Sequence, residues 1–129
     1  MTPAEIEALA DRFFAAISGG DVDGVRACYD PAVAVWHNYE AGEQGLEANL
    51  AVLGWLGRHI SDLRYDEIRR IVIEDGFVQQ HVLRGTTDWG LALEVPAMLR
   101  VYVAEGRIRR IEEYLDTAQV AELRQRRGS

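Results

Sequence analysis

Two histidines and one glutamate carry most of the chemistry that the sequence suggests: His37, His81 and Glu113. Each lies in a segment rich in β-branched, aliphatic and aromatic residues, a composition typical of β-strands. Histidine changes its protonation near neutral pH, and a carboxylate beside it orients the ring and stabilises its charged form. The three residues are therefore predicted to act together in general acid–base catalysis.

Six further residues near these three, or in the same part of the predicted sheet, are expected to bind the substrate. They are Trp36, Asn38, Trp89, Met98, Tyr114 and Asp116. Side chains alternate between the two faces of a strand, so Trp36 and His37 cannot both point straight into one cavity, nor can Glu113 and Tyr114. We expect His37, His81 and Glu113 to face inward.

Each of these residues also has a structural interpretation. A single histidine in a strand is more often a hydrogen-bonded structural residue than a catalyst, and Asp116 is placed to cap the next helix. Trp55 is expected in the core, and His59 as a solvated residue at a helix end. Arg84 is expected to pair with acidic neighbours on the outer face of the sheet, and Cys28 to be a small buried residue rather than a nucleophile.

A metal site is a further alternative, because two histidines and a carboxylate can form the facial triad of non-haem iron enzymes. No other His or Cys is nearby, and the sequence shows neither zinc-type cysteine spacing nor a Gly-rich phosphate loop. We therefore expect neither a metal nor a cofactor.

Capping signals and apolar spacing predict four helices that would position these residues. Thr2 and Glu5 have the spacing of a capping box, and Asp21 can cap a short second helix. The basic residues Arg124, Arg126 and Arg127 would complement the dipole of the last helix. The predicted helices run from Pro3 to Gly19-Gly20, Val22 to Tyr29, Leu46 to Arg58, and Asp116 or Thr117 to Arg126.

Period-two patterns between these helices predict five strands. Asp-Gly and Glu-Gly turns separate two pairs of the later strands, which indicates hairpins and a mostly antiparallel sheet. The predicted strands are Val33 to Asn38, Leu63 to Ile73, Phe77 to Thr86, Leu93 to Ala104, and Arg107 to Leu115. Helices gathered on one face of a curved antiparallel sheet make an α+β fold with a cavity between the layers.

Length and charge restrict the class of protein. The 129 residues are expected to form one domain, residues 1–129. A formal net charge of −7 disfavours binding to nucleic acid or to an anionic membrane surface. No secretion signal, lipidation motif or long apolar run is present, so the cytoplasm is the expected location.

The order of elements and several motifs resemble the nuclear transport factor 2-like superfamily. These motifs include Phe13-Phe14-Ala15-Ala16-Ile17, Val35-Trp36-His37, Leu83-Arg84-Gly85-Thr86 and Glu113-Tyr114-Leu115-Asp116. The resemblance implies a cone-shaped fold, in which a curved sheet is wrapped by N-terminal helices around a pocket, plus a short C-terminal helix. Because this fold supports many functions, activity has to be argued from the pocket residues.

Two activities of the superfamily match this sequence poorly. Gap-free counting places His37, Phe13 and Met98 at the base and the two oxyanion-donor positions of ketosteroid isomerase, so both donors are missing. Similarity to limonene epoxide hydrolase would imply a site for which Asn38 and Glu113 are plausible counterparts of two residues. That site also needs an Arg-x-Asp pair, which is missing from this sequence. The remaining constellation is more similar to the His-dependent dehydratases and to SnoaL-like aldol-type cyclases, where an acidic residue near the end of the last strand acts as acid or base.

The sequence therefore predicts a cofactor-independent isomerase, dehydratase or cyclase that acts on a hydrophobic small molecule. The alternative is a non-catalytic ligand-binding or dimerisation module of the same fold. Either protein could form a homodimer through the outer face of the sheet, for which the expected members include Ile68, Val72, Val82 and Val101.

Overall fold

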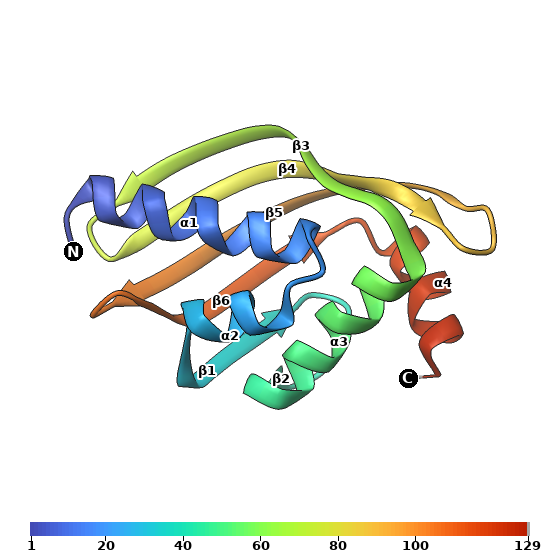
Figure 1. The fold of residues 1–129 in the computed structure, drawn as a ribbon, viewed down its shortest axis with the longest axis horizontal. Helices are drawn as coiled ribbons and strands as arrows, with labels where there is room; N and C mark the ends of the chain where they lie inside the picture. The colour runs from blue at the N-terminus through green and yellow to red at the C-terminus, as the bar shows by residue number, and fades with distance from the viewer. Residues whose placement is uncertain (129) are drawn as a thin grey trace.

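Four helices and six strands make up the computed structural model, which describes residues 1–128 (Figure 1). The helices are α1 (Pro3–Ser18), α2 (Val22–Cys28), α3 (Leu46–His59) and α4 (Thr117–Arg127). The strands are β1 (Tyr29–His37), β2 (Glu43–Gln44), β3 (Ile60–Ile73), β4 (Gly76–Thr87), β5 (Ala92–Ala104) and β6 (Arg107–Leu115). The predicted α+β class is confirmed.

All six strands form one curved sheet, in the order β2-β1-β6-β5-β4-β3. Strands β3 to β6 form the antiparallel meander that the turn residues predicted, and β2 is antiparallel to β1. Strand β1 instead pairs in parallel with β6. This pairing places the first long strand of the chain beside the last one, while α1, α2 and α3 lie on one side of the sheet (Figure 1).

The predicted helix caps are confirmed. Thr2 and Glu5 form a reciprocal capping box, in which each side chain accepts a hydrogen bond from the other residue's backbone N–H. The side chains of Asp21 and Asp116 accept from backbone N–H groups in the first turns of α2 and α4. These short-range bonds fix where three of the four helices begin.

The largest differences from the prediction are the starts of two strands and one additional strand. Strand β1 begins at Tyr29 rather than Val33, β3 begins at Ile60 rather than Leu63, and the two-residue strand β2 lies in a predicted loop. Tyr29 pairs with Ile108, and Ile60 pairs with Thr87. These extensions depend on partner strands far along the chain, which local composition does not reveal.

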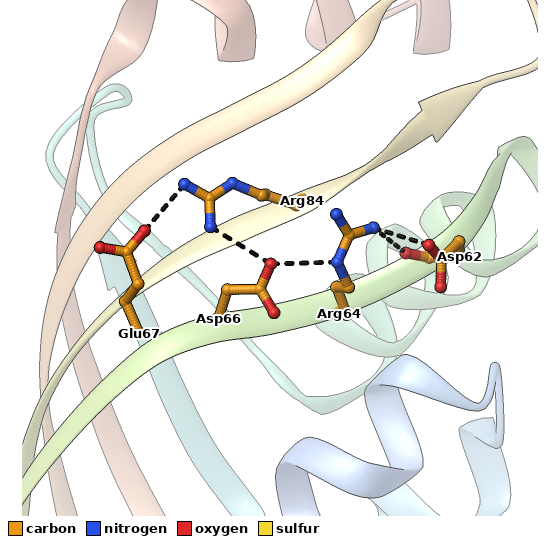
Figure 2. Close-up of polar contacts among 5 residues, drawn as sticks. All are labelled: Asp62, Arg64, Asp66, Glu67 and Arg84. Carbon is orange, nitrogen blue, oxygen red and sulfur yellow. Dashed lines mark hydrogen bonds and ion pairs between the residues drawn. The ribbon is translucent and has the colours of Figure 1, made fainter.

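Two bulges bend β3, which is an edge strand of the sheet. Asp62 and Glu67 have positive φ angles of 54° and 56°, and the register with β4 shifts beside each of them. Figure 2 shows the ion pairs that connect the bulged segment. Arg64 contacts Asp62 at 2.7 Å and Asp66 at 3.0 Å, while Arg84 contacts Asp66 at 3.2 Å and Glu67 at 2.8 Å. The acidic partners expected for Arg84 are confirmed.

The core lies between the helices and the inner face of the sheet. The buried stripe of α1 consists of Ile6, Leu9, Ala10, Phe13, Phe14, Ala16 and Ile17. Cys28 is buried as predicted, and this burial raises the pKa of its thiol. Val101 is fully buried, and Val72 packs against the core. The expectation that both belong to the outer face is wrong, because the sheet register pairs each of them with the inward-facing Phe77.

Candidate functional site

A cavity of about 160 Å³ lies between the inner face of the sheet and the helices α3 and α4. The three predicted catalytic residues His37, His81 and Glu113 all line it. They come from β1, β4 and β6, so three separate strands converge on the cavity. The inward orientation expected for these three side chains is therefore found.

His37 and Glu113 face each other because they are register partners in the parallel β1–β6 pair. His37 Nε2 lies 3.2 Å from Glu113 Oε1, and its Nδ1 lies 3.9 Å from Glu40 Oε1. The His37 ring also stacks on Tyr39, with 4.7 Å between the ring centroids. His37 is only 7% exposed, so packing holds the imidazole in place between two carboxylates.

A chain of hydrogen bonds holds Glu40 beside His37. The Tyr29 hydroxyl donates to Asn49 Oδ1 over 2.6 Å, and Asn49 Nδ2 donates to Gln44 Oε1 over 2.9 Å. Gln44 Nε2 then donates to Glu40 Oε1 over 2.7 Å. Burial raises the pKa of Tyr29 well above its ordinary value, so this hydroxyl keeps its proton and acts as a donor.

His81 sits deeper in the same cavity wall and is 3% exposed. Its ring meets the edge of Tyr65, with centroids 4.7 Å apart. Burial lowers the pKa of His81, and the negative charge of Glu113 partly opposes this effect. Burial therefore favours the neutral imidazole of His81 over its charged form.

Arg124 connects α4 to the rim of the cavity. Its Nη1 donates to the backbone oxygen of Tyr39 over 3.0 Å, and its guanidinium lies 4.8 Å from the centre of the Tyr39 ring. Its Nη2 is 3.8 Å from Glu40. Burial, together with the charges of Glu40 and Glu113, raises the pKa of Tyr39 to about 12. Arg124 lies in the last turn of α4 as predicted, but it also helps to build the site.

None of the six residues predicted to bind substrate lines this cavity, and five of them lie on the outer face of the sheet or at its end. Trp36 and Tyr114 pack together there with ring centroids 5.1 Å apart, and Met98 is 46% exposed. Asn38 exchanges two hydrogen bonds with the backbone of Leu115. Asn38, Met98, Tyr114 and Asp116 line a separate open hollow. Alternation along β1 and β6 explains this placement, since the neighbours of inward-facing residues face outward.

Trp89, the sixth residue, lies beyond the end of β4 and does not line the cavity. Its indole N–H donates to Glu122 over 2.6 Å, and Arg126 lies over its ring. Trp55, which was expected to be core, does line the cavity, and its ring packs on His59. His59 is not merely a solvated helix end, because its Nδ1 lies 2.6 Å from Asp88.

Several cavity residues were not predicted from the sequence. They are Tyr39, Glu40, Gln44, Asn49, Tyr65 and Arg124. Asn49 could have been identified from the sequence. It directly precedes Leu50 on the apolar side of α3, and a buried polar side chain there needs a hydrogen-bond partner. The others lie in a loop, a two-residue strand, a bulged strand and a helix end, where sequence periodicity is weak.

Neither a metal centre nor a membrane span is found in the described part of the chain. Residues 1–128 contain no group of three or more His, Cys, Asp or Glu side chains arranged to hold a metal ion. No helix within the same residues is long and apolar enough to cross a membrane.

Comparisons with known proteins support the fold. The model of a family described as the SnoaL-like domain matches residues 10–111. No curated protein gives a significant match. Among solved structures, PrhC from Penicillium brasilianum has a TM-score of 0.83 at 16% identity, covering 98% of this chain and 89% of that one.

Two further structures agree with this result. An NTF2-like protein from Burkholderia xenovorans has a TM-score of 0.76 at 22% identity, covering 95% of this chain and 97% of that one. A protein from Catenulispora acidiphila with a ketosteroid isomerase-like fold, in complex with trimethylamine, has a TM-score of 0.71 at 12% identity, covering 82% and 83%. The predicted resemblance in fold is confirmed.

Proposed function

Because this chain belongs to the SnoaL-like domain family, we propose that it is a small acid–base enzyme that acts on a hydrophobic molecule without a cofactor. The reaction is an isomerisation, a dehydration or an aldol-type cyclisation, each of which moves a proton at or beside a carbon atom. One observation carries the proposal: the His37 imidazole and the Glu113 carboxylate lie 3.2 Å apart at the wall of the cavity.

The His37–Glu113 pair suits proton transfer at a carbon atom next to a carbonyl group. When the C–H bond breaks, its two electrons move toward the carbonyl oxygen. The proton is taken up by the His37–Glu113 pair. If His37 takes the proton, its positively charged ring lies between the carboxylates of Glu113 and Glu40. Apolar residues such as Leu53, Leu83 and Val95 form much of the remaining wall and keep water from competing.

The cavity volume sets the size of the substrate. A closed apolar cavity of about 150 Å³ is enough to bind benzene, and the volume here is about 160 Å³. The best fit is therefore a compound with one ring, or with a chain of similar bulk. A polycyclic substrate would exceed this volume and would have to extend out of the cavity.

Deuterium exchange into small ketones tests the proposal without knowledge of the natural substrate. Cyclohexanone and acetophenone are incubated with the protein in D₂O, and loss of the α-proton signal is followed by NMR. We expect exchange to be faster than in buffer, and His37→Gln or Glu113→Gln to slow it about a hundredfold or more.

Glu112→Gln provides the matched control. Glu112 precedes Glu113 but binds Tyr102 and Arg110 on the other face of the sheet. This variant should exchange at the wild-type rate. Equal exchange by wild type, His37→Gln and Glu113→Gln would overturn the proposed role of the pair.

A non-catalytic binding or assembly module is the second candidate, and the exposed face of the sheet supports it. Ile68, Ile71, Met98 and Tyr114 are large apolar side chains that are 46–67% exposed on β3, β5 and β6. Apolar surface of this kind is typical of an interface. We propose that two copies of the chain associate through it, which is compatible with either function.

A further inference from the structure

Gln79 connects the cavity wall to Arg70, an arginine that is mostly buried. It lies on β4 two residues before His81, and its side chain is completely buried. Arg70 Nε, on the neighbouring strand β3, donates to Gln79 Oε1 over 2.8 Å. On the other side of the amide, Gln79 Nε2 lies 2.9 Å from His81 Nδ1. The residues therefore form a linear chain that ends at the cavity wall.

Arg70 determines the direction of every hydrogen bond in this chain. A guanidinium group has donors and no acceptor, so the oxygen of the Gln79 amide has to face it. The NH₂ group of Gln79 then faces His81 and donates to Nδ1, which can accept only as an unprotonated nitrogen. The single proton of a neutral His81 is therefore on Nε2. Burial independently lowers the pKa of His81 and so favours the neutral ring that this chain requires.

Arg70 is itself held firmly. Its Nη1 lies 2.8 Å from Asp11 and 3.4 Å from Glu7, both on α1. Its guanidinium lies 5.5 Å from the centre of the Phe77 ring, and its side chain is only 9% exposed. An arginine fixed by ion pairs and an aromatic ring cannot easily turn away from Gln79.

The free end of the chain is His81 Nε2. This atom is buried, and no group within residues 1–128 forms a hydrogen bond with it. Buried N–H groups without a partner are rare because they have lost their bonds to water. His81 lines the same cavity as His37 and Glu113 and also the open hollow on the outer face, and of these two spaces the cavity is the one that holds the proposed base.

We propose that Arg70 and Gln79 are positioning residues that hold His81 in its Nε2–H form, and that His81 donates to a carbonyl oxygen of the ligand. The catalytic role of His81 rests on the proposed function. In that reaction His81 stabilises the negative charge that develops on the carbonyl oxygen, while the His37–Glu113 pair receives the proton. His81 is a donor and not the base. The substrate class is thus a small carbonyl compound.

The tautomer of His81 can be measured directly. NMR of protein labelled with ¹⁵N in histidine distinguishes the two neutral forms and the imidazolium through the shifts of both ring nitrogens. We expect the Nε2–H form of His81 at pH 7.5 in the absence of ligand. An Nδ1–H form or an imidazolium would overturn the inference, whatever the activity of the protein.

Gln79→Glu should reverse the tautomer with little change in shape. One carboxylate oxygen still accepts from Arg70, and the other now accepts from His81, which places the proton on Nδ1. Gln80→Glu is the control, because Gln80 is the exposed neighbour on the opposite face of β4. If Gln79→Glu does not fold, Arg70→Met is used, which should leave a mixture of both tautomers. An unchanged Nε2–H form in the folded variant would contradict the proposed chain.

Binding of cyclohexanone, followed by its effect on the His81 ring signals, tests the ligand class. We expect cyclohexanone to shift the Nε2–H signal and to bind at least tenfold more weakly to Gln79→Glu, with no change in Gln80→Glu. Equal binding to all three proteins would refute carbonyl recognition by His81. If binding and tautomer behave as expected but no variant alters exchange, the proposed catalysis fails and the recognition by His81 stands.

Discussion

His37 and Glu113 are register partners across the parallel β1–β6 pair, and their side chains meet at 3.2 Å on the inner face of the sheet. Partners in a parallel ladder project to the same face, so the backbone pairing by itself brings the imidazole and the carboxylate together. Because both residues lie on strands rather than in loops, the sheet keeps their separation nearly constant.

A double-mutant cycle tests whether this pair acts as one unit. His37→Gln and Glu113→Gln should each reduce ketone exchange about a hundredfold or more, and the double variant should be only a few-fold slower than His37→Gln alone. Initial exchange rates measured by NMR at equal protein concentrations provide the comparison. If the two losses multiplied fully, the residues would be acting independently.

The burial of His81 predicts how stability depends on pH. Burial lowers the pKa of His81 in the folded protein, whereas the unfolded chain takes up this proton near pH 6.5. Below that pH the unfolded state binds more protons, so the free energy of unfolding should fall as the pH decreases from 7.5 to 5.5. Chemical denaturation at several pH values measures this slope, and His81→Gln should make it shallower.

Glu113→Gln should change the same slope in the opposite sense. The charge of Glu113 raises the pKa of His81, so its removal lowers that pKa further and increases the loss of stability on acidification. Glu112→Gln is the control in this experiment as well. A slope equal to that of wild type in Glu113→Gln would show that Glu113 and His81 are not coupled.

Asp116 should matter for stability and not for substrate. Its side chain accepts from the backbone N–H of Ala118 over 3.0 Å and caps α4. Asp116→Ala should lower the free energy of unfolding by about 1 kcal/mol, while Asp116→Ser should retain most of it. Denaturant titration measures both variants. A strong loss of cyclohexanone binding in Asp116→Ser would instead support the substrate-binding role suggested by the sequence.

Self-association should depend on the outer face of the sheet. Light scattering of the wild type at high micromolar concentration should report twice the mass of one chain. Met98→Glu places a charge among Met98, Tyr114 and their neighbours, and it should shift the protein toward the monomer. A wild-type protein that remains monomeric at that concentration would remove the assembly proposal.

Local signals in the sequence predicted much of the fold. The capping residues Thr2, Asp21 and Asp116 marked helix starts that the structure contains, because an N-cap acts within one turn of the chain. The resemblance to the superfamily gave the inward face expected for His37 and Glu113, and the structure places both, with His81, at the cavity. Alternation showed that Trp36 and Tyr114 could not share a face with His37 and Glu113, and in the structure the two aromatic residues pack together away from the cavity.

The sequence by itself determined the helices and most of each long strand, because helix capping and side-chain periodicity depend on interactions between near neighbours. The tertiary structure decided which side chains from different elements come into contact. The parallel β1–β6 pair brings His37 to Glu113, and the β3–β4 pair brings Arg70 to Gln79 and so sets the direction of the His81 proton. Such contacts join segments far apart in the chain, and their energy depends on register and burial that no local pattern records.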